Sequence, residues 1–387
     1  MKETVIKAID EYKNDFFTIS QYIGNNPELG NEEYKASKVL IEELRKHDFK
    51  VVTGVVNQPT AFEAVYDSGK PGPNIGYMSE YDALPEVGHA CGHNLIGTMG
   101  IAAGIALSKV VNETGGRVYV YGTPAEETRG AKVTMADEGL LDHLDAAIMA
   151  HPSSGYVKSG SSLAMDAIQF AFYGRSSHAA AAPEEGINAL DAVIQTFNSI
   201  NALRQHVTSD VRIHGIISEG GKAANVVPDY AVAQFYVRAN KRVALNDVVE
   251  KVTACAKGAA LATGARVEVS NYEYSYDDMI TNETLSDSFT RNLIEAGVNP
   301  DVIKVKFGSG SLDMGNVSHR TPSIHPFIKI SDKPITAHTH EFREAALSQE
   351  GFEGMLIGAK TMAMTGVDLL RDRKLLEEIK QEFKSAF

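Results

Sequence analysis

The chain contains 387 residues, of which 43% are hydrophobic, and its formal net charge is −13 at pH 7. This length exceeds what one hydrophobic core usually supports, so the sequence predicts two domains, and the apolar content argues against a disordered chain. The acidic balance argues against a nucleic-acid partner, because phosphate-backbone binding depends on clustered Lys and Arg side chains.

The N-terminal segment is predicted to be a helix and not a secretory signal. Apolar residues between Ile6 and Ile23 follow helical spacing, and charged residues interrupt the start of the segment. The longest mostly apolar stretch, Leu95 to Leu107, is too short and too Gly-rich to cross a bilayer, which needs roughly 20 apolar residues. We therefore expect a cytoplasmic protein with no membrane partner. The two cysteines, Cys91 and Cys255, give no reason to expect a disulfide framework.

Residues from about 50 to 150 alternate between strand-like and helix-like segments. Leu95 to Val111 and Gly130 to Leu141 have helical length and periodicity, with Asn94 and Thr128 as the expected N-caps. Five runs rich in Val, Ile and Tyr predict strands: Val51 to Val56, Ala61 to Tyr66, Asn74 to Ser79, Arg117 to Gly122 and Asp145 to Ala150. This alternation predicts an α/β sheet.

A second pattern begins near residue 166, where segments follow in the order strand, helix, strand, strand, helix, strand. These segments cover residues 168–173, 187–205, 211–218, 231–238, 245–263 and 266–270. The βαββαβ order is the ferredoxin-like pattern. We therefore predict that residues 166–278 form a domain inserted into a discontinuous domain of residues 1–165 and 279–387, which ends in a helical tail from Ala345 onward.

The densest group of reactive side chains lies in a short loop immediately ahead of the predicted helix Leu95 to Val111. Cys91 and His93 flank Gly92, and this spacing lets both side chains reach one metal centre because Gly permits a tight backbone path. The alternative interpretation of the loop by itself is a buried thiol beside capping histidines.

Further side chains of the same kind follow two other predicted strands. Glu126 and Glu127 are adjacent carboxylates, so one can bind metal while the other transfers protons, and His151 follows the strand that ends at Ala150. Each has an ordinary alternative, a solvated first turn of helix for the glutamates and a hydrogen-bonded core position for the histidine. In such sheets ligands bind beyond the carboxyl ends of the strands, which is where all of these side chains are predicted to lie. Buried charges are costly unless they are paired or bound to metal, so the gathering of these side chains at one edge favours a metal site. Mixed thiolate, imidazole and carboxylate ligands suit zinc best and are also compatible with manganese.

These side chains belong to longer motifs that extend from Pro27-Glu28-Leu29-Gly30 to His338. The motifs are Glu80-Tyr81-Asp82-Ala83-Leu84-Pro85, Gly88-His89-Ala90-Cys91-Gly92-His93-Asn94, Pro124-Ala125-Glu126-Glu127 and His151-Pro152. Together they resemble the aminoacylase and carboxypeptidase G family of dinuclear metallohydrolases. The Cys-Gly-His form is similar to the branch with aminobenzoyl-glutamate, auxin-conjugate and N-acyl-amino-acid hydrolases.

The resemblance implies a mixed-sheet, zinc-peptidase-like catalytic domain with two divalent metal ions per subunit. Cys91 would bridge the two ions, Glu126 would be the general base, and Asp82 would orient a ligating histidine. The remaining implied ligands are His93, Glu127, His151 and His338. His340 stands where the family usually has proline, and it remains an alternative to His338 as the last ligand. Asp313, in a segment that resembles another part of the family near the site, would have a supporting role.

The inserted domain resembles the family's dimerisation or lid domain. The resemblance implies that His178 reaches the centre of a neighbouring protomer and donates to the developing oxyanion. Asn225 and Arg238 would hold the polar end of the substrate, since Arg suits bidentate carboxylate binding. A homodimer is therefore the smallest expected unit, and larger homo-oligomers are compatible.

The predicted function is hydrolysis of the amide bond of an N-acyl amino acid, a dipeptide or an aryl-glutamate conjugate by a metal-activated water, with Glu126 as general base. Two alternatives remain open at this level: a thiol hydrolase in which Cys91 is the nucleophile, and a metal-binding scaffold without catalysis. The residue pattern does not define which acyl group or amino acid is the substrate.

Overall fold

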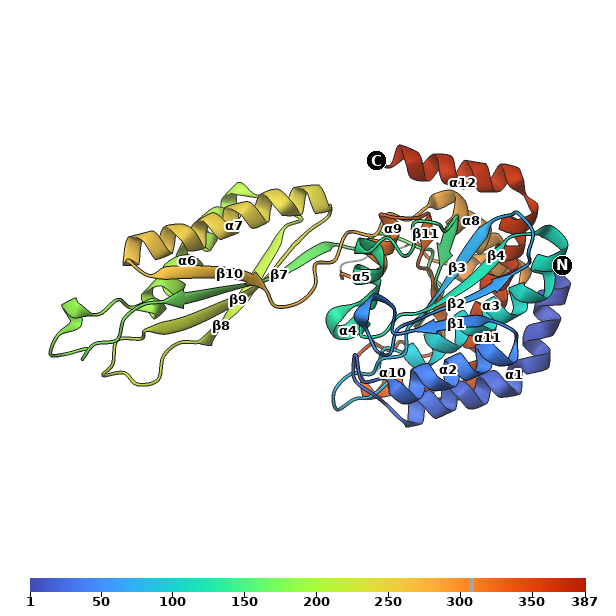
Figure 1. Ribbon diagram of the computed structural model, residues 1–387, viewed down its shortest axis with the longest axis horizontal. Coiled ribbons are helices and arrows are strands. Elements are labelled where there is room, and N and C mark those ends of the chain that lie inside the picture. The colour runs from blue at the N-terminus through green and yellow to red at the C-terminus, as the bar shows by residue number, and fades with distance from the viewer. Residues whose placement is uncertain (306–309) are drawn as a thin grey trace. The chain divides into compact units, whose positions relative to one another are not determined.

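The computed structural model describes residues 1–305 and 310–387, and these residues form two compact units. The first consists of residues 1–161 with the described parts of 279–308 and 313–387. The second consists of residues 162–278 with the described part of 309–312. Both units combine helices with a sheet (Figure 1).

A mixed six-stranded sheet lies at the centre of the first unit. Its strand order is β1-β2-β4-β3-β5-β11, in which β4, β3, β5 and β11 run parallel and β1 and β2 are antiparallel to their neighbours. The strands are β1 (Lys50–Thr53), β2 (Phe62–Asp67), β3 (Asn74–Ser79), β4 (Arg117–Gly122), β5 (Ala146–Ile148) and β11 (Ser323–Ile324). Because β3, β4 and β5 are parallel, their carboxyl ends meet at one edge of the sheet, as the sequence predicted. A mixed α/β sheet is thus confirmed.

Helices pack around this sheet, and a two-stranded parallel sheet of β6 (His151–Ser153) and β12 (Phe327–Lys329) lies beside it. The helices are α1 (Lys2–Asn25), α2 (Tyr34–Lys46), α3 (His93–Thr114), α4 (Glu126–Arg129), α5 (Ala131–Asp137), α8 (Glu283–Glu295), α9 (Met314–Ser318), α10 (His340–Ala346), α11 (Gln349–Arg371) and α12 (Arg373–Ser385). In Figure 1, α1 and α2 lie on the β1 side of the unit, and α11 runs beside α3.

Helix α3 is the core helix of the first unit and packs against β3 and β4. A Cβ added at Gly97 would lie 2.7 Å from the carbonyl oxygen of Glu80, and one added at Gly100 would lie 2.9 Å from that of Met78. Glycine at these positions therefore lets the helix approach the end of β3 closely. Within the described part of the chain, α3 is the one helix long and apolar enough to span a membrane, and 94% of its apolar window is buried inside the protein.

Two predicted helix starts are wrong. Asn94 lies inside α3, where its side-chain amide donates to Ser20 Oγ and to the carbonyl oxygen of Ala346, and Thr128 lies inside α4. Gly92, with φ +80°, is the N-cap residue of α3, so Asn94 already lies in the first turn of the helix. The helix expected from Gly130 to Leu141 is shorter than predicted, since α5 ends at Asp137.

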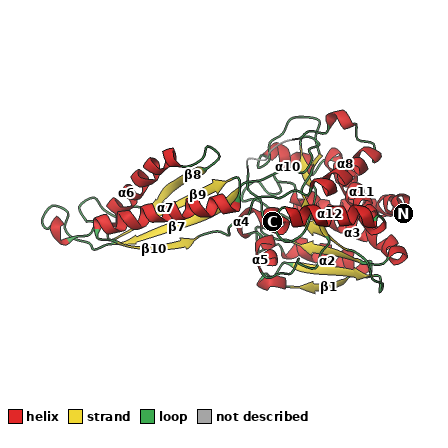
Figure 2. Ribbon diagram, turned by 90° about the horizontal axis from the view of Figure 1, so that it is seen from above, coloured by secondary structure: helices red, strands yellow, loops and turns green. Residues whose placement is uncertain are grey.

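The second unit has an antiparallel four-stranded sheet of order β10-β7-β9-β8. Its elements are β7 (Ala164–Tyr173), α6 (Ala189–Leu203), β8 (Arg212–Glu219), β9 (Tyr230–Ala239), α7 (Arg242–Thr263) and β10 (Arg266–Asn271). Figure 2 shows α6 and α7 on the same face of this sheet, where they bury a core that includes Phe170, Phe172 and Phe235. The element order is the predicted βαββαβ pattern.

Candidate metal centre and catalytic site

A sharp turn ahead of α3 places Cys91 and His93 on the same side of the chain. Gly92 at the turn has φ +80°, in the left-handed region that favours glycine, and an added Cβ would lie 2.8 Å from Pro152 Cγ. The chain therefore passes close to the start of β6, where His151 lies. Cys91 Sγ is 3.4 Å from His151 Nε2.

The predicted ligands come together at the edge formed by the strand ends. Potential donor atoms of Cys91, His93 and His151 all lie within 4.8 Å of one another, and so do those of Cys91, Glu127 and His338. Cys91 is common to both groups. His338 Nε2 is 3.3 Å from Glu127 Oε1.

The backbone of His338 is anchored to the same loop as Cys91. Its φ is +68°, and its N–H donates to the carbonyl oxygen of Ala90 at 2.9 Å. His340, the alternative last ligand, is exposed at the start of α10 and belongs to none of the three-donor groups found among the described residues. The structure thus places His338, and not His340, beside Glu127.

The carboxylate of Asp82 contacts two of these residues, His93 and Glu127. Its Oδ1 is 2.9 Å from His93 Nδ1, and its Oδ2 accepts a hydrogen bond from the backbone N–H of Glu127 at 3.0 Å. Burial alone would raise the pKa of Asp82, but the attraction of His93 and these hydrogen bonds outweigh it, so that this pKa lies below its usual range. A charged Asp82 keeps the proton of His93 on Nδ1 and turns Nε2 toward the other donors.

The unsatisfied atoms of the cluster fit a divalent metal ion. His93 Nε2 and Glu127 Oε1 are buried and lie 3.9 Å apart, and neither makes a hydrogen bond of regular geometry among the described residues, although His338 Nε2 lies 3.3 Å from Glu127 Oε1. Buried polar atoms in native proteins are almost always paired, so two such atoms facing each other fit a site that binds a cation. A set of thiolate, imidazole and carboxylate donors is one that zinc accepts readily.

Glu126 belongs to a second, adjoining cluster of carboxylates. Oxygen atoms of Glu80, Glu126 and Asp313 lie within 4.8 Å of one another. Burial, followed by repulsion from Glu80 and Asp313, raises the pKa of Glu126 well above its usual range. Lys132 supplies the cation of this cluster: its Nζ is fully buried and lies 2.6 Å from both Glu80 Oε1 and Asp313 Oδ1. Asp313 therefore lies where the sequence placed it, close to the site but not in the group around Cys91.

Sequence reasoning did not single out Lys132 or His325. His325 is buried with its ring 5.4 Å from that of His151, and burial lowers its pKa well below the usual range. For Lys132 a signal existed, because a lone Lys stands among Ala131, Val133 and Met135 in a helical segment. His325 carries no comparable signal in its neighbours.

Two of the three predicted lid residues lie together in the second unit. His178 forms an isolated bridge with Val226, and the N–H of Ala179 donates to the carbonyl oxygen of Asn225 at 3.1 Å. The Nδ1 of His178 accepts hydrogen bonds from the backbone of Ala180 and Ala181, which leaves Nε2 as the N–H donor of an exposed ring.

Arg238 lies far from Asn225 in the same unit, so the two residues do not meet at one point within a single subunit. Asn225 precedes the first residue of β9, Tyr230, whereas Arg238 is close to the other end of that strand. At about 3.3 Å per residue, the eight steps from Tyr230 to Arg238 separate the two ends by roughly 26 Å. The guanidinium of Arg238 lies over the ring of Tyr236, 5.7 Å from its centroid.

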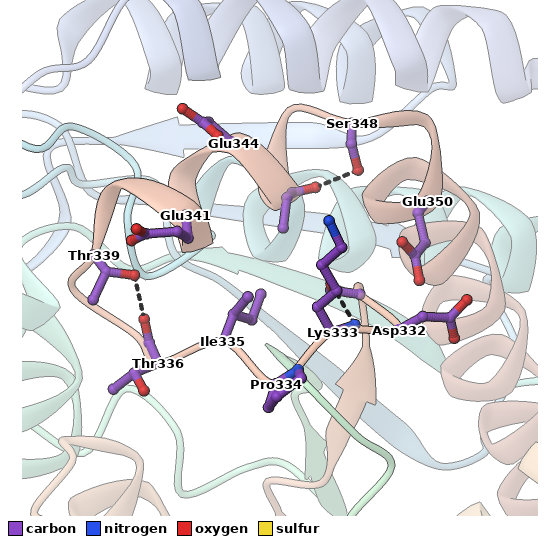
Figure 3. Close-up of a pocket in the computed structure, with 12 residues that line it drawn as sticks. Asp332, Lys333, Pro334, Ile335, Thr336, Thr339, Glu341, Glu344, Ser348 and Glu350 are labelled. Carbon is purple, nitrogen blue, oxygen red and sulfur yellow. Dashed lines mark hydrogen bonds between the residues drawn. The ribbon is translucent and has the colours of Figure 1, made fainter.

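A cavity of about 820 Å³ lies between the segment 331–336 and the helices α10 and α11 (Figure 3). Its lining includes Asp332, Glu341, Glu344 and Glu350, with Lys333 among them. None of the predicted site residues is among those that line it. The donor cluster is therefore distinct from this hollow of the surface.

Known proteins of similar sequence match the chain across both units. Residues 163–263 match the family model of the M20 peptidase dimerisation domain. The Xaa-Arg dipeptidase of Mus musculus is 36% identical over 99% of this chain and 92% of the mouse protein. A p-aminobenzoyl-glutamate hydrolase subunit of Escherichia coli K12 is 29% identical over 97% of this chain and 93% of its own length.

A solved structure extends the likeness to the fold. A dinuclear metal-binding peptidase of the M20 family from Bacillus subtilis superposes with a TM-score of 0.68 at 18% identity, covering 93% of this chain and 99% of the other. The sequence match to the mouse dipeptidase spans both units of the chain at a level that establishes common descent. The chain therefore belongs to the M20 family of peptidases and amidohydrolases, as its motifs indicated.

Proposed function

We propose that this protein is a metal-dependent amidohydrolase in which Glu126 is the general base and the group around Cys91 holds two divalent cations. The observation that carries the proposal is the placement of Glu126, a half-buried carboxylate, directly beside two three-donor groups that share Cys91. Amide hydrolysis requires a base of this kind, which accepts a proton from water and returns it to the leaving nitrogen. The relatives, which include a dipeptidase and an aminobenzoyl-glutamate hydrolase, support the reaction class.

The residues that would hold the cations are Cys91, His93, Glu127, His151 and His338. When bound, divalent cations supply Lewis-acid activation of the substrate carbonyl and of the attacking water. Mixed sulfur, nitrogen and oxygen donors favour zinc, and manganese is the second candidate.

The other steps belong to the side chains of the chain itself. Glu126 takes the proton of the attacking water and delivers it to the amide nitrogen as that nitrogen leaves. Asp82 holds His93 in one tautomer throughout.

The test is Glu126→Gln, which keeps the shape of the side chain and removes the base. We expect turnover to fall by about three orders of magnitude or more, with metal content unchanged. Glu138→Gln, at an exposed position just after the end of α5, is the matched control and should keep full activity. Activity of the Glu126 variant near that of the control would refute the assignment.

A specific contact also supports the thiol mechanism as the second candidate. Cys91 Sγ is 3.4 Å from His151 Nε2, which is the spacing of a thiol and its general base. Complete removal of metal by a chelator separates the two mechanisms. Hydrolysis that survives chelation would require the Cys91 nucleophile, whereas hydrolysis restored only by zinc or manganese supports the metal mechanism.

The inserted domain supports a site shared between two copies of the chain. We propose that His178 and Asn225, which lie together, reach the centre of a partner subunit, where the Nε2–H of His178 donates to the developing oxyanion. Arg238 lies near the other end of β9, so Arg238 and Asn225 of one chain would contribute to the sites of different subunits. Mixing inactive His178→Ala and Glu126→Gln subunits should restore part of the activity, and no recovery after proven exchange would contradict a shared site.

For the substrate, we propose N-acyl amino acids or dipeptides, with a basic C-terminal residue as the first class to test. The support is the 36% identity to a dipeptidase named for its Xaa-Arg substrates, against 29% to the aminobenzoyl-glutamate hydrolase subunit. A mass-spectrometric screen of dipeptides, N-acyl amino acids and aryl-glutamates, run with zinc and with manganese, tests this order. A preference for aryl-glutamates over Xaa-Arg and Xaa-Lys dipeptides would overturn it.

A further inference from the structure

The turn that presents Glu126 and Glu127 has an unusual backbone. Ala125, immediately before the two glutamates, has φ +62° and is fully buried. A non-glycine residue in this left-handed region costs roughly 1–2 kcal/mol, so surrounding contacts must hold it there. The direction in which both glutamates leave β4 depends on this residue.

A buried carboxylate from a distant part of the sequence provides such a contact. Glu33 is fully buried, and its Oε1 accepts a hydrogen bond from the backbone N–H of Ala125 at 2.9 Å. Its Oε2 accepts one from Thr60 Oγ1 at 2.8 Å. Both oxygen atoms of Glu33 are therefore occupied, one of them by the turn itself.

The segment that carries Glu33 is itself fixed in place. Glu33 is the N-cap residue of α2, and the carboxylate of Glu28 accepts hydrogen bonds from the N–H groups of Lys35 and Ala36 in the first turn of that helix. A Cβ added at Gly30 would lie 2.9 Å from the Cβ of Ala125. The segment from Gly30 to Glu33 thus packs directly beneath the turn.

We propose that Glu33 is a positioning residue of the metal centre, which acts through Ala125 to aim Glu126 and Glu127. The turn is held at two points: Glu33 binds the N–H of Ala125, and Asp82 binds the N–H of Glu127. Loss of the first point lets the turn relax toward ordinary backbone angles and displaces both glutamates. This inference rests on the proposed function for the roles of the two glutamates, but its test does not depend on knowing the substrate.

The test compares Glu33→Ala with Glu33→Gln by titration of the metal-free protein with Co²⁺ alone, followed by its visible absorption. Supporting residues around metal ligands typically contribute about 10- to 100-fold in affinity, and we expect a loss in that range for Glu33→Ala, with an altered Co²⁺ spectrum. In Glu33→Gln the side-chain carbonyl still accepts from Ala125, so affinity should stay within about threefold of wild type. On an active substrate, kcat of Glu33→Ala should fall about tenfold while KM changes little.

Two controls separate positioning from general stability. Thr60→Val removes the other hydrogen bond to the same carboxylate and leaves the Ala125 contact intact, so it should lower Tm without changing Co²⁺ affinity. Glu32→Gln alters the exposed neighbouring glutamate and should change neither. Co²⁺ binding by Glu33→Ala that matches wild type, or equal losses in Glu33→Ala, Glu33→Gln and Thr60→Val, would overturn the proposal. A wild-type protein that binds Co²⁺ but cleaves no amide would instead refute the proposed function, and the affinity comparison would still decide the role of Glu33.

Discussion

Replacing Lys132 with Met is expected to destabilise the catalytic unit strongly. The ammonium group has no exposed surface and lies 2.6 Å from each of two carboxylates, Glu80 after β3 and Asp313 at the start of α9. Methionine preserves the volume of the side chain but removes the cation that lies closest to both carboxylates. Removing one partner of a buried ion pair costs about 3–5 kcal/mol, because the remaining charge stays desolvated.

Urea unfolding of the metal-free protein, followed by far-ultraviolet circular dichroism, measures this loss; the chain has no tryptophan to serve as a fluorescent probe. The matched control is Lys7→Met, whose exposed pair with Glu3 should contribute no more than about 0.5 kcal/mol. Burial raises the pKa of Asp313 to about 6, so the penalty of Lys132→Met should shrink between pH 8 and pH 5 as that carboxylate takes up a proton. A loss below about 1 kcal/mol, or one equal to that of Lys7→Met, would refute the assignment of Lys132 as the counter-ion of the cluster.

Three further outcomes follow from single contacts. Gly92→Ala should abolish tight metal binding, because the added Cβ would lie 2.8 Å from Pro152 Cγ and the residue has φ +80°. Metal content after purification measures this effect, and a full complement of metal in the variant would contradict the prediction. Asp82→Asn should weaken zinc binding about 10- to 100-fold in calorimetric titration, and unchanged affinity would show that His93 needs no such partner. Burial and the nearby charge of Asp82 raise the pKa of Glu33 to about 7 from its usual 4.5. Between these two pH values the folded state therefore binds more protons than the unfolded state, and the free energy of unfolding falls as pH rises. At 1.36 kcal/mol per pKa unit the expected loss is about 3 kcal/mol. Glu33→Gln should remove this slope from the urea-unfolding free energy of the metal-free protein, and parallel pH profiles would contradict the raised pKa.

The sequence alone determined the parts of this protein that depend on local patterns. Strands β3 and β4 begin and end where the predicted runs Asn74–Ser79 and Arg117–Gly122 do, because these central strands of the mixed sheet are mostly buried and rich in Ile, Val and Tyr. The βαββαβ order of the second unit was equally readable. The ligand loop around Cys91 was recognisable because metal-binding side chains at short spacing are rare away from a site.

The tertiary structure decided which residues support that site and which of the predicted partners lie together. Glu33 and Ala125 are separated by 92 positions and Lys132 and Asp313 by 181, so no pattern of short period connects them. Asn225 precedes one end of β9 and Arg238 lies near the other end, and the two are far apart because an extended chain gains about 3.3 Å with every residue. Local spacing determines what a segment can become, whereas the contacts of a buried polar group depend on which distant segment supplies a complementary partner in the packed chain.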